Sequence, residues 1–211
     1  MQIPPASVIH LLHEASHAIL STHSTQLPGY PYGTAVPLVV DEAQRPLLLI
    51  SALAEHTKNL LADPRASLAV IEAGQANVQD AARATLVGRI EPFQPRPELV
   101  QRYLRYQPDA EQFLQLDFQF FRMQVERIRY IGGIGRMGWL DAGSWLTTDV
   151  LSEDEETRLL ALAPPSVHLL GIDPFGIDYI TGGTRQRQRF ESALPADEIG
   201  KCLQRLLPTQ G

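Results

Sequence analysis

The sequence of 211 residues lacks several features that would assign it to a specialised class of protein. Cys202 is the only cysteine, which excludes an intrachain disulfide and a thiolate metal cluster. Positive charge is scarce, since 18 lysines and arginines stand against 24 aspartates and glutamates. The resulting net charge of −6 argues against a nucleic-acid partner that requires phosphate neutralisation. No apolar run approaches the roughly 20 residues of a membrane span, and residues 1–5 lack the basic start of a signal peptide. We therefore expect a cytoplasmic globular protein.

Hydrophobic periodicity predicts a helix followed mainly by short strands. Apolar residues recur at helical spacing in residues 6–20, and the other face of this helix would carry His10, His13 and His17. Three such imidazoles could bind a metal or touch a haem, but a partly solvated polar face is the simpler interpretation. Two further helices are expected, at 54–62 and 98–105. Strands are predicted at 18–22, 34–40, 47–51, 66–72, 83–91 and 122–130. This pattern favours a small closed sheet over repeated βαβ units.

A second, smaller domain is predicted after a boundary near residues 143–149. Ser152 begins a charged helix, which the proline pair at 164–165 ends. Three short strands and a terminal helix follow, so the expected order is αβββα. The expected elements are strands at 167–172, 177–180 and 185–190 and a helix at 196–207. The predicted domains are therefore residues 1–146 and 150–211.

The third strand of this second domain leaves two interpretations open. Arg185, Arg187 and Arg189 alternate along it and face one way. They could form an anion-binding stripe, although a basic edge strand that discourages unwanted pairing is the preferred interpretation.

A glycine-rich segment follows the strand predicted at 122–130. Its four glycines, Gly132, Gly133, Gly135 and Gly138, permit positive φ or the close approach of another group. The letters from Gly133 to Gly138 match GxGxxG, but no helix of a βαβ unit follows, so a dinucleotide-binding loop is not expected.

The best candidate anion site lies at residues 51–59, where a continuous apolar strand leads into a helix. The start of a helix offers free backbone N–H groups and a positive dipole end. His56, Thr57 and Lys58 could add donors to a phosphate there, while Glu55 would oppose one. The alternative is an ordinary helix start with a solvated Lys58.

Together with residues 29–37 and 53–68, the segment 127–140 resembles the FMN-binding split-barrel superfamily, whose members are similar to pyridoxamine 5′-phosphate oxidase. The likeness covers residues 7–146 and is closest to the HugZ/HutZ-type haem-utilisation branch, which carries a fused C-terminal domain. This resemblance implies an α+β fold, with a split β-barrel and flanking helices before the small αβββα domain. It also implies a homodimer with the cofactor site at the subunit interface and a small-molecule substrate.

The resemblance further implies which residues hold FMN. The phosphate would be bound by Ser51, His56, Thr57 and Lys58, and the ring would lie beside Thr34, Ala35 and Val36, with Arg83 also reaching the flavin. The expected activity is that of an FMN-dependent oxidoreductase, a flavoprotein of unknown substrate with no assignable catalytic residues.

The alternative is a haem-binding, haem-utilisation protein that resembles a haem oxygenase and has a degenerate or absent flavin site. In the HugZ/HutZ branch the axial histidine comes from a C-terminal segment, but residues 206–211 contain no histidine. His168 is then the candidate haem ligand, with an ordinary strand residue as the other interpretation. No further metal site is expected.

Overall fold

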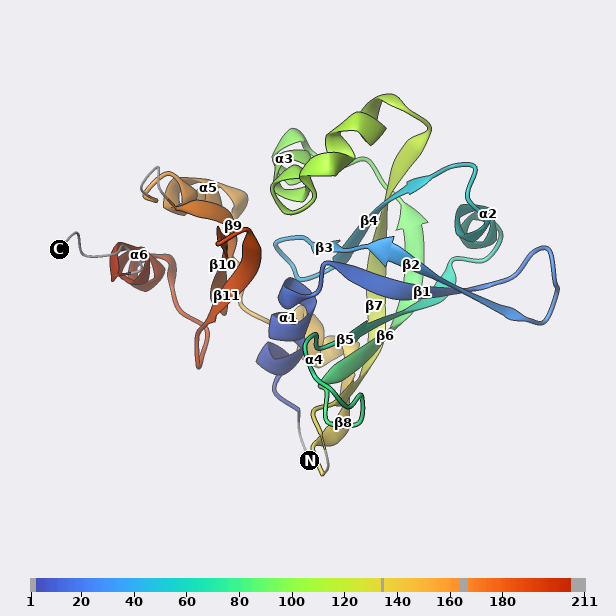
Figure 1. Cartoon of the computed structure of the whole chain (residues 1–211), viewed down its shortest axis with the longest axis horizontal. Helices are drawn as coiled ribbons and strands as arrows, with labels where there is room; N and C mark the ends of the chain where they lie inside the picture. The colour runs from blue at the N-terminus through green and yellow to red at the C-terminus, as the bar shows by residue number, and fades with distance from the viewer. Residues whose placement is uncertain (1–2, 134, 164–166, 206–211) are drawn as a thin grey trace. The chain divides into compact units, whose positions relative to one another are not determined.

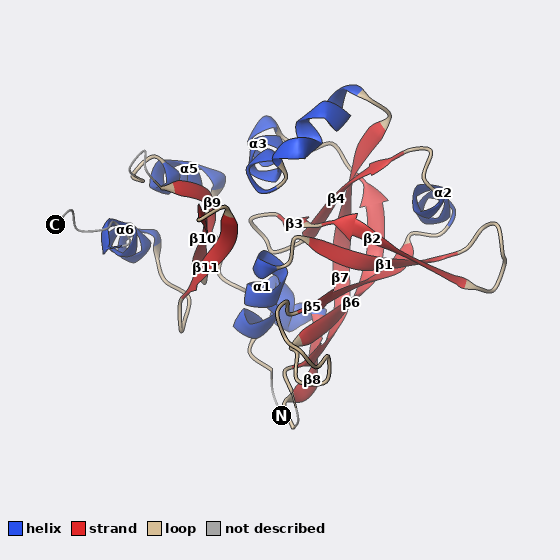
Figure 2. Ribbon diagram, viewed as in Figure 1, coloured by secondary structure: helices blue, strands red, loops and turns tan. Residues whose placement is uncertain are grey.

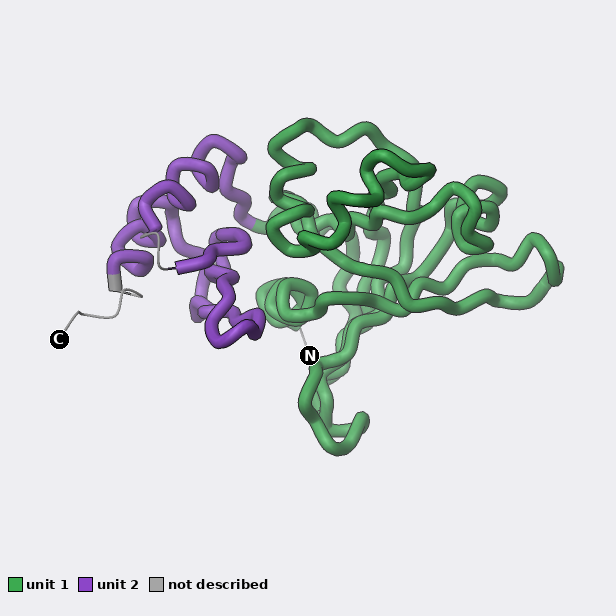
Figure 3. Tube along the Cα trace, turned by 45° about the horizontal axis from the view of Figure 1, so that its top comes forward, with its two compact units in different colours: residues 1–148 green, residues 149–211 purple. Residues whose placement is uncertain are grey.

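The computed structural model describes residues 3–133, 135–163 and 167–205. The chain divides into two compact units, residues 1–148 and residues 149–211 (Figure 3).

The first unit is built on one curled antiparallel sheet (Figure 1). Its strands follow the order β2-β1-β5-β6-β7-β4-β3, and β8 pairs with β7. The mixed α+β class and the curled sheet are as predicted. Among the described residues the strands are β1 (His17–His23), β2 (Pro31–Pro37), β3 (Val39–Val40), β4 (Pro46–Ser51), β5 (Arg65–Ile71), β6 (Arg83–Pro92), β7 (Phe118–Ile131) and β8 (Met137–Asp141).

Strand composition determines which face of the sheet is buried. In β5 and β6 buried and more exposed residues alternate, because successive side chains point to opposite faces of a strand. Strand β4 differs, since Pro46 to Ile50 are all buried, as its continuous apolar run predicted. Large side chains fill the interior, among them Leu20, Leu47, Leu48, Leu68, Leu86 and Phe121.

Strand β7 spans 14 residues and pairs with three other strands. It pairs with β6 along most of its length, while its first part pairs with β4 and its last part with β8. The register with β6 shifts at Gly88, where one extra residue of β7 forms a bulge. A Cβ atom at Gly88 would collide with the carbonyl oxygen of Gln124, so the bulge requires glycine.

The predicted N-terminal helix is too long. Helix α1 runs from Pro5 to Glu14, and β1 begins at His17. Burial in β1 alternates with a period of two, as the strand predicted at 18–22 requires, and pairing with β2 on one side and β5 on the other overrides the helical periodicity. The three histidines therefore do not share a helical face. His17 lies exposed in β1, and His13 is buried with its Nε2 atom 2.8 Å from Gln44 Oε1, so the solvated interpretation was wrong for His13.

The remaining described helices of this unit are α2 (Glu55–Ala62), α3 (Pro97–Tyr106) and α4 (Ala142–Leu146), with a 3₁₀ segment η1 at Pro108–Gln115 (Figure 2). Helices α2 and α3 were predicted, whereas α4 and η1 were not. Helix α2 packs beside β1 and is fixed there by Asn59, whose amide nitrogen donates to Thr22 Oγ1 at 3.0 Å. Across both units, none of the described helices has the length and hydropathy of a membrane span.

The second unit has the predicted αβββα order. Helix α5 (Glu153–Leu160) begins with a capping box formed by Ser152 and Glu155. The proline pair predicted to end this helix lies outside the described residues. Strands β9 (His168–Asp173), β10 (Gly176–Thr181) and β11 (Thr184–Arg189) form an antiparallel sheet with β10 in the middle, and α6 runs from Ala196 to Arg205. The core of this unit includes Leu159, Leu169, Ile172, Ile177, Ile199 and Leu203.

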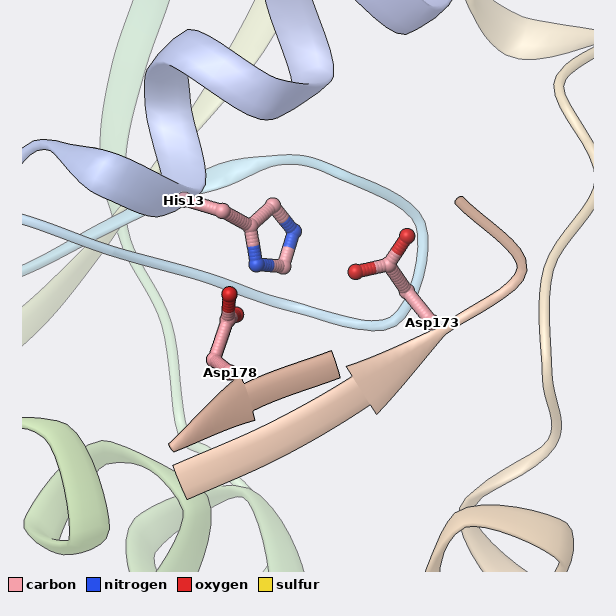
Figure 4. A group of neighbouring side chains, drawn as sticks. All are labelled: His13, Asp173 and Asp178. Carbon is pink, nitrogen blue, oxygen red and sulfur yellow. The ribbon is translucent and has the colours of Figure 1, made fainter. Parts of the chain in front are cut away.

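A buried ion cluster joins the three strands of the second unit. Asp173 ends β9 and Asp178 lies on β10, as Figure 4 shows, while His13 in the same picture belongs to the first unit. Arg187 of β11 donates to both aspartates, at 2.8 Å from Asp178 Oδ1 and 2.8 Å from Asp173 Oδ2. The two carboxylates raise the pKa of the Arg187 guanidinium. Arg187 is therefore part of the protein's own interior and does not belong to an anion-binding stripe, although β11 is an edge strand as expected.

Removal of Arg187 should destabilise the second unit strongly. Arg187→Met would remove the guanidinium that contacts both buried aspartates, and breaking a buried ion pair from one side costs about 3–5 kcal/mol. Amide hydrogen exchange in β9 and β10 should therefore accelerate. Lys201→Gln, at an exposed position of α6, serves as the control and should change stability by less than about 0.5 kcal/mol. Unchanged exchange in Arg187→Met would show that the ion cluster contributes little to folding.

Candidate functional site

A cavity of about 320 Å³ lies where the barrel sheet does not close. Strands β2 and β4 contact each other, but no backbone ladder joins them among the described residues. The cavity is lined by residues 35–37 of β2 and 49–51 of β4. The rest of its wall is formed by Ala54 and His56 at the start of α2, by Tyr103 and Gln107, by several residues of η1, and by Phe118. This volume lies within the usual range for a small-molecule site.

Four of the predicted cofactor-binding residues, Ala35, Val36, Ser51 and His56, line this cavity. Small side chains at Ala35 and Ala54 help leave the space open. One wall is aromatic, because the rings of Phe113 and Phe118 stack with centroids 4.5 Å apart. The site therefore suits a ligand with a substantial apolar part.

Tyr103 of α3 forms part of the wall and was not predicted. Its hydroxyl accepts a hydrogen bond from the Leu49 N–H at 3.2 Å. Burial raises the pKa of Tyr103 to about 12, so this phenol stays protonated at neutral pH. The helical pattern indicated only that Tyr103 lies on the apolar face. A buried tyrosine needs a partner for its hydroxyl, which was the signal that could have identified it.

His56, the second residue of α2, presents an imidazole to the cavity. Its Nε2 atom is buried and has no hydrogen-bond partner within the described part of the chain. Burial lowers the pKa of His56, so the neutral imidazole predominates near pH 7. A neutral imidazole nitrogen can accept a hydrogen bond or bind a metal ion.

The two hydroxyl groups predicted to hold a phosphate are used within the protein. Ser51 Oγ donates to Asp117 Oδ2 at 3.0 Å and accepts from the Leu53 N–H at 3.1 Å. Thr57 is fully buried, and its hydroxyl donates to the Ser51 carbonyl oxygen at 2.6 Å. Each hydroxyl has a single proton to donate, so neither can give it to a phosphate in this conformation.

Two kinds of donor remain at this end of α2. Lys58 is exposed, and the N–H groups of Glu55 and His56 precede the first internal hydrogen bonds of the helix. The N–H groups of Thr57 and Lys58 already donate to the Ala54 carbonyl oxygen, at 3.1 and 3.2 Å. Glu55 occupies the first turn and Asp117 lies against Ser51, so negative charge is already present there. This end of α2 can still receive an anionic group, but it is less favourable to a dianion than the sequence indicated.

The other predicted ring and phosphate contacts lie apart from the cavity. Thr34 is half-buried on β2 and is not among the residues that line it. Arg83 donates to the carbonyl oxygens of Val78 and Ala81, at 3.0 and 3.3 Å. Along β7, Ser51 pairs with Phe118 whereas Arg83 pairs with Ile131, a separation of 13 residues or roughly 40 Å of strand. Within one chain, Arg83 and Ser51 are therefore too far apart to contact the same phosphate.

The glycine-rich segment forms the turn between β7 and β8. Gly133 and Gly135 have φ values of 97° and 80°, which confirms the prediction of positive φ. The Gly132 N–H donates to the Arg136 carbonyl oxygen at 2.7 Å, which closes a hairpin and leaves no helix start for a phosphate. Residue 134 lies outside the described residues. His168, the predicted haem ligand, is exposed at the start of β9 in the second unit.

Comparison with known proteins finds relatives of similar sequence and similar fold, several of which are named for haem. The chloroplastic haem oxygenase HOZ of Arabidopsis thaliana is 32% identical over 133 residues, which is 62% of this chain and 41% of that protein. The chain thus spans less than half the length of this relative.

Two solved structures match nearly the whole chain. A haem-binding protein of Mycobacterium smegmatis has a TM-score of 0.63 at 22% identity and covers 97% of this chain and 99% of its own. The protein Atu2129 of Agrobacterium tumefaciens, of unknown function, has a TM-score of 0.74 at 22% identity and covers 95% of this chain and 94% of its own. At such identities the likeness concerns the fold.

HutZ of Vibrio cholerae, a haem storage protein, covers 67% of this chain and 95% of its own at 24% identity, with a TM-score of 0.50. The family comparison is more direct, since residues 6–147 match the CREG beta-barrel family. These residues include the curled sheet, the cavity and the start of α2. Because the match extends over well more than half of its length, this chain belongs to the CREG beta-barrel family.

Proposed function

We propose that this protein binds haem in the cavity between β2 and β4 and acts in haem utilisation. The observation that carries this proposal is an apolar cavity beside a helix start whose two hydroxyls are already hydrogen-bonded to the protein. Haem combines a large apolar ring with carboxylates at one edge. The aromatic wall of Phe113 and Phe118 suits the ring, and the start of α2 with Lys58 suits a carboxylate.

The named relatives support haem over other ligands. HOZ is a haem oxygenase, and the protein of M. smegmatis binds haem. Bound haem would supply redox chemistry at its iron, while this chain would supply apolar contacts, orientation and the exclusion of water.

A second subunit is part of this proposal, because the barrel sheet exposes apolar side chains on one face. Cross-strand register and strand alternation place Ile19, Ile71, Val87, Met137 and Trp139 on that face, and all five are exposed. We propose that this face pairs with a second copy and that the ligand lies at the subunit interface. Sedimentation at micromolar concentration should then give the mass of a homodimer, whereas a monomer mass would exclude the shared site.

Hemin should bind to the purified protein, and filling the cavity should weaken that binding. A Soret band that saturates at one hemin per chain is the expected result of a titration. Ala35→Trp would place an indole in the cavity from a strand position that tolerates aromatic residues, and should raise the Kd at least about tenfold. Ala76→Trp, in an exposed loop, is the matched control and should bind as the unmodified protein does. Absence of a Soret band at micromolar hemin would contradict the proposal.

FMN is the second candidate ligand, as the sequence first indicated. The open N-terminus of α2 and the exposed Lys58 favour it, because both can approach a phosphate. An FMN complex would make the protein a flavin-dependent oxidoreductase, with the flavin carrying the electrons.

The FMN alternative has its own test at Lys58. A charge-assisted contact to phosphate contributes roughly 1.5–3 kcal/mol, so Lys58→Ala should weaken FMN about tenfold to a hundredfold. Folding should be unaffected, because an exposed lysine contributes little stability. Fluorescence titration with FMN measures the affinity, with Lys201→Ala on α6 as the control. If FMN does not bind at micromolar concentration while hemin does, the flavin alternative is excluded.

A further inference from the structure

A second cavity, of about 570 Å³, adjoins the cavity between β2 and β4. Leu49 of β4 and Phe118 of β7 belong to the walls of both. The rest of the second wall is formed by residues 92–95, Val100 of α3, Leu114 of η1, Gln119 and Phe120. The two cavities are therefore neighbours that share part of one wall.

The shared wall lies on one face of the sheet, and α3 and η1 cover that face. Leu49 pairs with Phe120, and Phe118 lies two residues before Phe120, so these three side chains point the same way. The ring of Tyr103 in α3 packs edge-on against Phe120, with 5.3 Å between the centroids. The ring of Phe113 in η1 stacks on Phe118 at 4.5 Å. The stacked pair of Phe113 and Phe118 thus stands where the two cavities meet.

The volumes of the two cavities limit the size of the ligand. Small-molecule sites measure about 300–1,000 Å³, and the first cavity, at about 320 Å³, lies at the lower end of that range. A haem needs more room than this cavity alone offers. The two cavities together reach the upper part of the range, so a ligand of that size would occupy both and displace Phe118 from between them.

The segment that holds Phe113 against Phe118 has few buried anchors. Of the eight described residues of η1, only Ala110 is buried. The hydrogen bonds of a 3₁₀ helix have poorer geometry than those of an α-helix. A segment with few buried apolar contacts opens at a lower free energy than the core strands do. Movement of η1 is therefore the least costly way to separate the two rings.

We propose that Phe118, stacked on Phe113, is a gate between the two cavities, and that the ligand site extends across it. The inference rests on the haem-binding function proposed above and assigns the second cavity to the same ligand. The gate opens when η1 withdraws Phe113 and the Phe118 ring turns aside. In the second wall, the side-chain amides of Gln94 and Gln119 can donate hydrogen bonds to a carboxylate of the ligand.

Filling the second cavity from η1 tests how far the site extends. Leu114→Trp places an indole in that cavity and should raise the hemin Kd at least about tenfold in a Soret titration. Leu116→Trp is the matched control, because Leu116 is exposed just after η1 and is not among the described residues that line either cavity. This variant should bind hemin as the unmodified protein does.

Stopped-flow mixing with hemin tests the gate itself. The observed rate for the unmodified protein should level off as hemin rises, because opening precedes binding. Phe118→Ala removes the stacked pair, so its limiting rate should be about twofold to tenfold higher. Phe118→Leu also removes the stack and keeps an apolar side chain, so it provides the result if circular dichroism shows that the Ala variant is unfolded.

The possible failures are distinguishable. If the unmodified protein binds no hemin, the proposed function is wrong and the gate is lost with it. If Ala35→Trp weakens hemin binding and Leu114→Trp does not, the ligand is confined to the first cavity and only the present inference is overturned. A rate that rises in proportion to hemin, and is the same in the Phe118 variants, would also overturn the gate while leaving haem binding intact.

Discussion

A buried hydrogen bond between β4 and α3 lies at the gap between β2 and β4, where the sheet does not close. The N–H of Leu49 lies on the side of β4 that approaches β2, and it donates to the hydroxyl of Tyr103. Because a side chain of α3 satisfies this backbone group, β4 does not need β2 as a partner. The gap between the two strands can therefore persist, and the cavity occupies it. Tyr103 of α3 thus satisfies a backbone donor at the wall of the cavity, where neither β2 nor another strand does so.

Hydrogen bonds within the protein also set the chemistry at the start of α2. The Thr57 hydroxyl donates to the Ser51 carbonyl oxygen, and the Ser51 hydroxyl donates to the Asp117 carboxylate. A phosphate bound here would have to replace that carboxylate or lie against its negative charge. These contacts connect the end of β4 to α2 and to the strand that follows η1. They hold the helix start in place, but they use the donors that would make it a strong anion site. What remains is a largely apolar cavity whose wall includes His56.

The second unit depends on a different interaction. Its small sheet has an arginine between two aspartates, all buried, and these three side chains come one from each strand. Such a cluster contributes less to stability than an apolar core of the same volume, but it strongly penalises any register that separates the charges. It acts together with the backbone ladders and the apolar core to fix the pairing of the three short strands.

Much of the architecture followed from the sequence. Period-two patterns identified β5 and β6, the continuous run identified β4, and Ser152 identified the start of α5, because each signal is local. Helix α1 was predicted too long, since pairing with β2 and β5 decided the conformation of residues 17–23. The sequence also determined that Ser51, His56, Thr57 and Lys58 lie together at a strand-to-helix turn. Only the tertiary structure decided which of their hydrogen-bond donors are available to a ligand. Residues distant in sequence, such as Asp117 and Tyr103, form hydrogen bonds with some of the polar groups around the cavity and not with others.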